Sequence, residues 1–157
     1  MPKIASCLWF DTEGEDAAKL YVSLFPNSRI KSVSHYPSDS PVGAPGKVLT
    51  VDFELDGTPF TALNGGPMFK FSEAVSFQVF VKDQAELNHY WDGLLAGGGQ
   101  ESQCGWLKDR FGLSWQIVPE KMASWMTDPA SAQRVMAAFM PMRRLDIPTL
   151  EKAAAGG

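Results

Sequence analysis

Hydrophobic and polar positions follow the same order twice along the chain. The first half opens with a strand pattern at residues 3–10. Apolar residues then recur every three or four positions from Ala17 to Phe25, which is typical of one face of an amphipathic helix. Strand patterns follow at residues 29–36, 47–55 and 58–64. Asp56 and Gly57 lie between the last two and indicate a tight hairpin turn. The first half therefore predicts a strand, a helix and three more strands.

The second half repeats this scheme and then changes to helices. A strand is predicted at 74–82, a helix from about 84 to 95, and strands near 101–107 and 113–118. After Pro119 the pattern is helical only. Asp128 followed by Pro129 is a typical helix start, and Asp146 opens a last short helix. The end of the chain is therefore predicted to be a helical tail.

This pattern predicts an α+β fold made of two βαβββ modules with curved mixed sheets. We expect one domain over residues 1–157, with module one at about 1–66, module two at about 72–119 and the tail at about 120–157. A single βαβββ module has a sheet face that it cannot cover alone. Two modules can cover each other's faces, and the hollow between the sheets then forms a pocket.

Composition narrows the class of protein. The net charge is −4 and Lys and Arg do not cluster, which argues against binding to nucleic acid or to an anionic membrane. The sequence has neither a secretory signal pattern nor an apolar run of membrane-spanning length, so a cytoplasmic protein is expected. Cys7 and Cys104 lack metal-ligand spacing, and two buried free thiols are expected, with a disulfide as the alternative.

Several motifs resemble one known family. They are Leu-Trp-Phe-Asp at 8–11, Leu-Asn-Gly-Gly at 63–66 and the long segment 104–119. Together with the duplicated βαβββ order they resemble the PhnB-like family, labelled 3-demethylubiquinone-9 3-methyltransferase-like, of the glyoxalase/bleomycin-resistance (vicinal oxygen chelate) superfamily. The resemblance covers essentially the whole chain. It implies a glyoxalase-like fold and a homodimer, in a superfamily of isomerases, ring-cleaving dioxygenases, thiol transferases and drug-sequestering proteins.

The resemblance also implies where a metal would be bound. In metal-dependent relatives four ligands come from the first and last strand of each module. The corresponding residues, found by counting back from the Asp after each opening strand and by aligning the two hairpin glycines, are Ile4, Thr61, Ser76 and Gln116. None offers an imidazole or a carboxylate, and Ile4 cannot bind a metal. We therefore expect no metal and no cofactor.

Side chains alternate between the two faces of a strand, so every second residue from these four positions is expected to line the same cavity. The predicted ligand-binding residues are Ser6, Leu8, Phe10, Thr61, Leu63, Ser76, Gln78, Phe80, Ser114 and Gln116. Such a cup is mostly apolar with a few amides and hydroxyls, which suits a small, partly aromatic or amphipathic organic molecule. The alternative is that bulky side chains such as Phe80 and Leu8 fill it.

The catalytic residues stay unassigned. His35 and His89 are the only histidines, and spacing suggests no Ser-His-Asp set. Asp109 is interpreted as capping its own hairpin turn. Cys104 is a weak candidate for a thiolate nucleophile, because Lys108 is its only basic neighbour in the sequence.

Three functional hypotheses follow. The first is a metal-free protein that binds a small organic ligand. The second is an enzyme, either a methyltransferase as the family label implies or a metal-independent lyase or isomerase. Against methyl transfer, the glycine run at 97–99 follows a helix, whereas a nucleotide-binding turn precedes one. The third is a structural or regulatory module with a filled cavity. A homodimer is expected, because each sheet leaves edge strands that a partner can cover and five of the seven Met lie in the tail. The alternative is that these Met pack on the tail's own chain.

Overall fold

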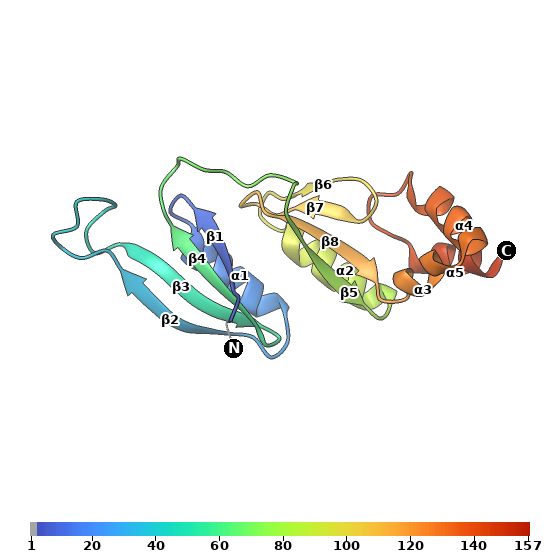
Figure 1. Ribbon diagram of the computed structural model, residues 1–157, viewed down its shortest axis with the longest axis horizontal. Coiled ribbons are helices and arrows are strands. Elements are labelled where there is room, and N and C mark those ends of the chain that lie inside the picture. Colours follow the sequence, from blue (N-terminus) through green and yellow to red (C-terminus); the bar gives the residue numbers. More distant parts are fainter. Residues whose placement is uncertain (1–2) are drawn as a thin grey trace. The chain divides into compact units, whose positions relative to one another are not determined.

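The computed structural model of the chain describes residues 3–157 and divides it into two compact units. The first unit extends to Phe71, and the second runs from Ser72 to the C-terminus. Each contains one four-stranded sheet and one helix packed on it (Figure 1). No helix within residues 3–157 combines the length and the apolar character needed to cross a membrane.

The first unit has the predicted element order. Its elements are β1 (Ser6–Phe10), α1 (Gly14–Leu24), β2 (Arg29–His35), β3 (Val48–Leu55) and β4 (Thr58–Asn64). Asp56 and Gly57 join β3 to β4 with φ angles of 47° and 85°. Both residues are in the left-handed region, as a two-residue hairpin turn that matches the strand twist requires.

The second unit repeats the order and adds the helical tail. Its elements are β5 (Ser76–Val81), α2 (Gln84–Leu95), β6 (Gln100–Glu101), β7 (Trp106–Lys108), β8 (Ser114–Pro119), α3 (Met122–Thr127), α4 (Pro129–Phe139) and α5 (Ile147–Ala155). The side chain of Asp128 accepts a hydrogen bond from the Ser131 amide at 2.9 Å, so the predicted cap of α4 is confirmed.

The single strand predicted at 101–107 is wrong, because two short strands, β6 and β7, occupy this region. Cys104 and Gly105 interrupt it with φ angles of 58° and 86°, which a strand cannot accommodate. Their amides donate to the carbonyls of Met142 and Arg143 at 2.7 and 2.8 Å. The tail backbone therefore fixes this turn.

The two sheets have the same strand order. In the first sheet it is β1-β4-β3-β2 and in the second β5-β8-β7-β6, so the opening and closing strands of each unit are parallel neighbours and the other pairs are antiparallel. Such mixed sheets from two βαβββ units are the predicted glyoxalase/bleomycin-resistance-like fold, with helices at the C-terminus. The duplication seen in the sequence is thus a duplication of topology.

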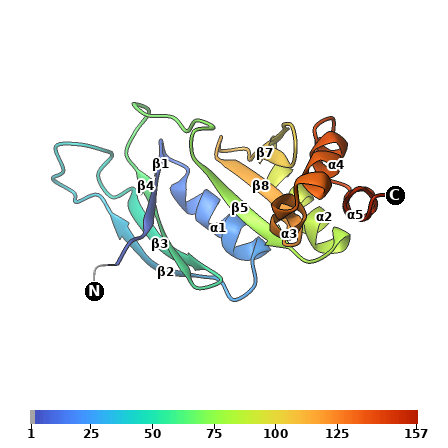
Figure 2. The same cartoon turned by 45° about the vertical axis from the view of Figure 1, so that its right-hand side comes forward.

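The helices α1 and α2 each cover one face of the sheet in their own unit (Figure 2). In the first unit Ala17, Ala18 and Tyr21 of α1 are fully buried, as are Val51 and Phe53 of β3. In the second unit α2 buries Leu87, Trp91 and Leu94, and the buried strand residues on that side are Leu107, Trp115 and Ile117. Apolar burial of this kind is the main favourable term that holds each helix to its sheet.

Asp109 fixes the hairpin between β7 and β8. This buried carboxylate accepts hydrogen bonds from the amides of Phe111 and Leu113 at 2.9 and 3.1 Å. Its other oxygen accepts from the indole nitrogen of Trp115 at 2.9 Å. The interpretation of Asp109 as a turn cap is therefore confirmed, and the residue also orients a core aromatic side chain.

Replacing Trp115 by alanine is expected to lower the free energy of unfolding by about 3–5 kcal/mol, as truncations of large core aromatics do. Trp115 is 2% exposed, and its loss leaves one Asp109 oxygen without its indole donor. Gln116→Ala, on the opposite face, is the matched control and should change stability little. Chemical denaturation of both variants measures this. A strongly destabilised Gln116→Ala beside a neutral Trp115→Ala would invert the assignment of faces.

Candidate functional site

Each sheet keeps one face that its helix does not cover, and we call this the open face. In the second sheet the register pairs Ser76 with Ser114 and Gln78 with Gln116. Phe80 follows on the same side by alternation, whereas Phe77 contacts Trp115 on the helix side. The alternation therefore places all five predicted residues of this unit on the open face. That they bind a ligand stays a prediction.

In the first sheet the predicted face of β1 is wrong. The register pairs Cys7 with Thr61 and Trp9 with Leu63, so these four residues share the open face. The predicted residues Ser6, Leu8 and Phe10 lie on the other face, opposite Phe60, Ala62 and Asn64. Leu8 and Phe10 are buried in the core with α1.

The error has a simple physical origin in the turns that follow the opening strands. Residues 11–13 separate β1 from α1, whereas only residues 82–83 separate β5 from α2. Asp83 is the cap of α2 and accepts from the Glu86 amide at 2.8 Å, but Asp11 precedes the cap position of α1. The two aspartates are not equivalent, and counting back from them shifts β1 by one residue, which exchanges its faces.

Polar pairs across neighbouring strands occupy the part of the first open face that β2, β3 and Thr61 form. Thr61 donates to Asp52 at 2.7 Å and Ser32 donates to the other oxygen of Asp52 at 3.3 Å. Lys31 and Arg29 both lie within salt-bridge distance of Glu54, at 3.2 and 3.6 Å. The polar side chains of this face therefore satisfy one another.

The open face of the second sheet is organised differently. Across β7, β8 and β5 the register aligns Lys108 with Ser114 and Ser76, and the next row aligns Trp106 with Gln116 and Gln78. The Gln116 amide nitrogen donates to the Ser76 hydroxyl at 2.8 Å. Val118 and Phe80 form a third, apolar pair. The face thus changes from cationic and hydroxylic at one end to apolar at the other.

Two pockets lie on this open face. The larger, of about 600 Å³, is bounded by Val75, Ser76, Gln78, Phe80 and Gln116 among others. Phe80 is 57% exposed there, which is unusual for a large aromatic residue in a sheet. The smaller, of about 140 Å³, is lined by Trp106, Lys108 and Ser114, together with residues of β6 and the loop before β5.

Ser114 is the unusual residue of the smaller pocket. It is 1% exposed, and its hydroxyl is the one buried side-chain polar atom of residues 3–157 without a hydrogen-bond partner. Beside it the Lys108 ammonium group contacts Glu73 at 2.5 Å. The hydrogen bond from Lys108 holds the pKa of the Glu73 carboxyl below its usual value, so Glu73 is ionised at neutral pH.

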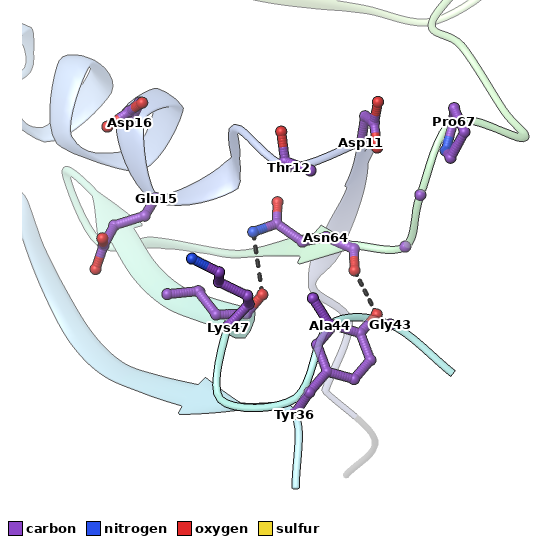
Figure 3. A pocket seen from close by; sticks show the side chains of 13 residues that line it. Asp11, Thr12, Glu15, Asp16, Tyr36, Gly43, Ala44, Lys47, Asn64 and Pro67 are labelled. Carbon is purple, nitrogen blue, oxygen red and sulfur yellow. Dashed lines mark hydrogen bonds between the residues drawn. The ribbon is translucent and has the colours of Figure 1, made fainter. Parts of the chain in front are cut away.

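The first unit contains a pocket of about 740 Å³ at the end of β4 (Figure 3). Asp11, Glu15 and Asp16 lie on its α1 side, and Lys47 and Tyr36 come from the opposite loop and strand end. None of the predicted cavity residues lines it. The signal that could have found it is the Leu-Asn-Gly-Gly motif at 63–66, because Asn64, Gly65 and Gly66 line the pocket.

Asn64 organises this pocket. Its side-chain oxygen accepts from the Gly14 amide at 2.8 Å and so caps α1, which has no side-chain cap of its own. Its side-chain nitrogen donates to the Val48 carbonyl at 3.2 Å, and its own carbonyl accepts from the Tyr36 hydroxyl at 2.6 Å (Figure 3). The buried polar atoms here already have structural partners, in contrast to Ser114.

The remaining candidate residues form no reactive cluster in the described part of the chain. No group of three or more His, Cys, Asp or Glu within residues 3–157 could hold a metal ion. Ile4 precedes β1 and is 90% exposed. The expected burial of both thiols is wrong for Cys7, which is exposed on β1, and Cys104 is partly exposed at the turn against the tail. Both are free cysteines.

Comparison with known proteins gives the family. The sequence model of the 3-demethylubiquinone-9 3-methyltransferase family matches residues 2–118, about three quarters of the chain. The chain belongs to this family. The match includes both sheets and the whole open face of the second unit, but ends before the helical tail.

Solved structures agree with this assignment. A PhnB protein from Bacillus cereus is 30% identical, with a TM-score of 0.67 over 74% of this chain and 99% of that protein. A protein from Pseudomonas aeruginosa is 19% identical, with a TM-score of 0.60 over 76% of this chain and 98% of its own, and supports the fold alone. No curated protein matches the chain.

Replacing Asn64 by alanine is expected to lower the free energy of unfolding by about 1–3 kcal/mol. The variant leaves the buried Gly14 amide and the Val48 carbonyl without their side-chain partners. Thr61→Val, three residues earlier on the same strand, removes only a hydrogen bond on the open face and serves as the control. Thermal and chemical unfolding measure both. Equal stability of Asn64→Ala and the wild type would refute the capping role.

Proposed function

We propose that the protein binds a small organic ligand on the open face of its second sheet and does so without the metal site of the superfamily. The observation that carries this proposal is the pocket of about 600 Å³ that combines the exposed Phe80 with the hydrogen-bonded pair of Gln116 and Ser76. Its volume lies within the range of small-molecule sites, which bury an apolar body and orient it with a few polar groups.

Gln116 and Gln78 supply the orienting groups. Gln78 is exposed beside Phe80 and offers two donors and one carbonyl acceptor. Gln116 uses one amide hydrogen for Ser76 and offers its second donor and its carbonyl oxygen. The aromatic ring of Phe80 and the side chain of Val75 supply the apolar surface, since both are largely exposed. A flat, partly aromatic molecule with one or two polar substituents fits this arrangement.

The direct test is binding of 2-naphthamide, a neutral aromatic amide, measured by isothermal titration calorimetry. Gln116→Ala should weaken binding about five- to tenfold, because one lost hydrogen bond contributes about 1 kcal/mol. Gln103→Ala is the matched control, since this exposed amide of the same unit lines neither pocket of the open face. Native mass spectrometry of the purified protein should also reveal a bound small molecule.

Two outcomes would contradict the proposal. One is the absence of both a co-purified molecule and any 2-naphthamide binding at millimolar concentration. The other is binding that Gln116→Ala and Gln103→Ala reduce equally, which would place the ligand elsewhere.

The family description favours a second candidate, a methyltransferase. Under this alternative the protein binds S-adenosylmethionine, whereas a ligand-binding protein without methyl-transfer activity has no need to. Calorimetric titration with S-adenosylmethionine separates the two. Micromolar binding would favour the methyltransferase, and no binding would leave the ligand-binding proposal standing alone.

We also propose that the protein is a homodimer. Met136 on α4 is 46% exposed, and Met140 directly after this helix is 56% exposed, which gives the tail adaptable apolar surface. Met136→Lys should shift the protein toward monomer in sedimentation equilibrium at micromolar concentration. Gln133→Lys, an exposed position on the same helix, is the control. A wild-type monomer, or a dimer that Met136→Lys leaves intact, would refute this interface.

A further inference from the structure

We propose that the ligand of the second sheet is an organic acid, whose anionic group binds to Lys108 and Ser114 while its apolar body lies against Trp106 and Phe80. This inference rests on the proposed ligand-binding function and deepens it by naming the chemical class.

The first observation is the buried hydroxyl of Ser114. Buried polar groups in folded proteins are nearly always paired, because an unpaired one costs its desolvation energy. Ser114 is the exception within residues 3–157, and it lines the smaller pocket of the open face. A hydroxyl at this position can donate one hydrogen bond to an acceptor that enters the pocket.

The second observation is the charge beside that hydroxyl. The register pairs Lys108 directly with Ser114 on the same face, and Lys108 is the cation among the residues that line either pocket of this face. An ammonium donor and a hydroxyl donor side by side select an acceptor with negative charge, since charge-assisted hydrogen bonds are the stronger ones. A carboxylate fits this pair better than an amide or an alcohol does.

Two carboxylates of the chain, those of Glu73 and Glu101, line the same pocket, but neither blocks the binding of an acid. Glu101 uses one oxygen to accept from the indole nitrogen of Trp91 at 3.0 Å. Glu73 holds Lys108, yet its side chain is 62% exposed. An ion pair at the surface contributes little to stability, so a ligand carboxylate can displace Glu73 at low cost. In the absence of ligand, the Glu73 carboxylate then takes the position beside Lys108 that the ligand carboxylate takes on binding.

The third observation is the gradient along the face. Lys108 and Ser114 form the first row with Ser76, the amides of Gln116 and Gln78 form the next row with Trp106, and Val118 and Phe80 follow. Successive residues on one face of a strand are about 7 Å apart. A molecule with an acid group at one end and a ring at the other therefore matches the order of polar and apolar rows.

The experiment compares 2-naphthoate with 2-naphthamide, which share their ring and differ in charge. The wild type is expected to bind 2-naphthoate about tenfold or more tightly than 2-naphthamide, a difference of about 1.4 kcal/mol. Lys108→Met should abolish this preference, so that the two compounds bind this variant with similar affinity. Lys31→Met is the matched control, because Lys31 makes the same kind of ion pair, with Glu54, on the first sheet.

Two further variants keep the test independent of a loss of folding. Glu73→Gln removes the competing carboxylate and should strengthen 2-naphthoate binding several-fold, a gain that a misfolded variant cannot give. Ser114→Ala should weaken 2-naphthoate binding while leaving the melting temperature equal or higher, because the hydroxyl makes no hydrogen bond within the described residues. A purely structural Ser114 would instead lower the melting temperature and leave binding unchanged.

The outcomes separate the two proposals. If 2-naphthamide binds through Gln116 and 2-naphthoate binds no better, the acid is excluded and the ligand-binding function stands. A preference for 2-naphthoate that survives Lys108→Met likewise overturns the assignment to Lys108. If neither compound binds and no molecule co-purifies, both proposals fall together.

Discussion

One helix can cover only one face of a four-stranded sheet, and the rest of the structure depends on this limit. In both units the covered face is apolar and closely packed, while the other face has no cover from its own helix. The two sheets treat the exposed face differently. The first has cross-strand polar pairs such as Thr61 with Asp52, whereas the second leaves Phe80 exposed and the Ser114 hydroxyl without a hydrogen-bond partner. The same topology therefore carries two chemically different surfaces, and within residues 3–157 the second contains the buried hydroxyl without a hydrogen-bond partner.

Much of the fold could be predicted from the sequence because its signals are local. The turn residues Asp56 and Gly57 fix the hairpin, and β4 and α2 have the predicted bounds. Asp109 could be recognised as a turn cap because an aspartate can accept hydrogen bonds from backbone amides two and four residues later in its own turn. The residues on the open face of the second sheet could be predicted because side chains alternate between the two faces of a strand and the β7–β8 hairpin fixes where the alternation starts.

The errors arose where distant parts of the chain decide the local conformation. The faces of β1 depend on the length of its turn into α1, and that turn is set by Asn64, fifty residues away at the end of β4. The break between β6 and β7 depends on backbone hydrogen bonds to Met142 and Arg143 in the tail. The missing partner of Ser114 could not be predicted either, because an unmade hydrogen bond leaves no pattern in a sequence. Local periodicity contains no information on any of these contacts.

The strand order has a consequence for how the protein is made. In the first unit β1 pairs with β4, so Ser6 finds its partner Phe60 only after more than fifty further residues have been synthesised. During translation the apolar side chains of β1 and α1 are therefore made before β4, the strand that pairs with β1. Contacts between residues so far apart in the chain form slowly. The second unit closes over a shorter separation, from Ser76 to Ser114. The first unit therefore closes its sheet over the longer separation, and Leu8 and Phe10 remain without Ala62 and Asn64, their neighbours on β4, until those residues have been synthesised.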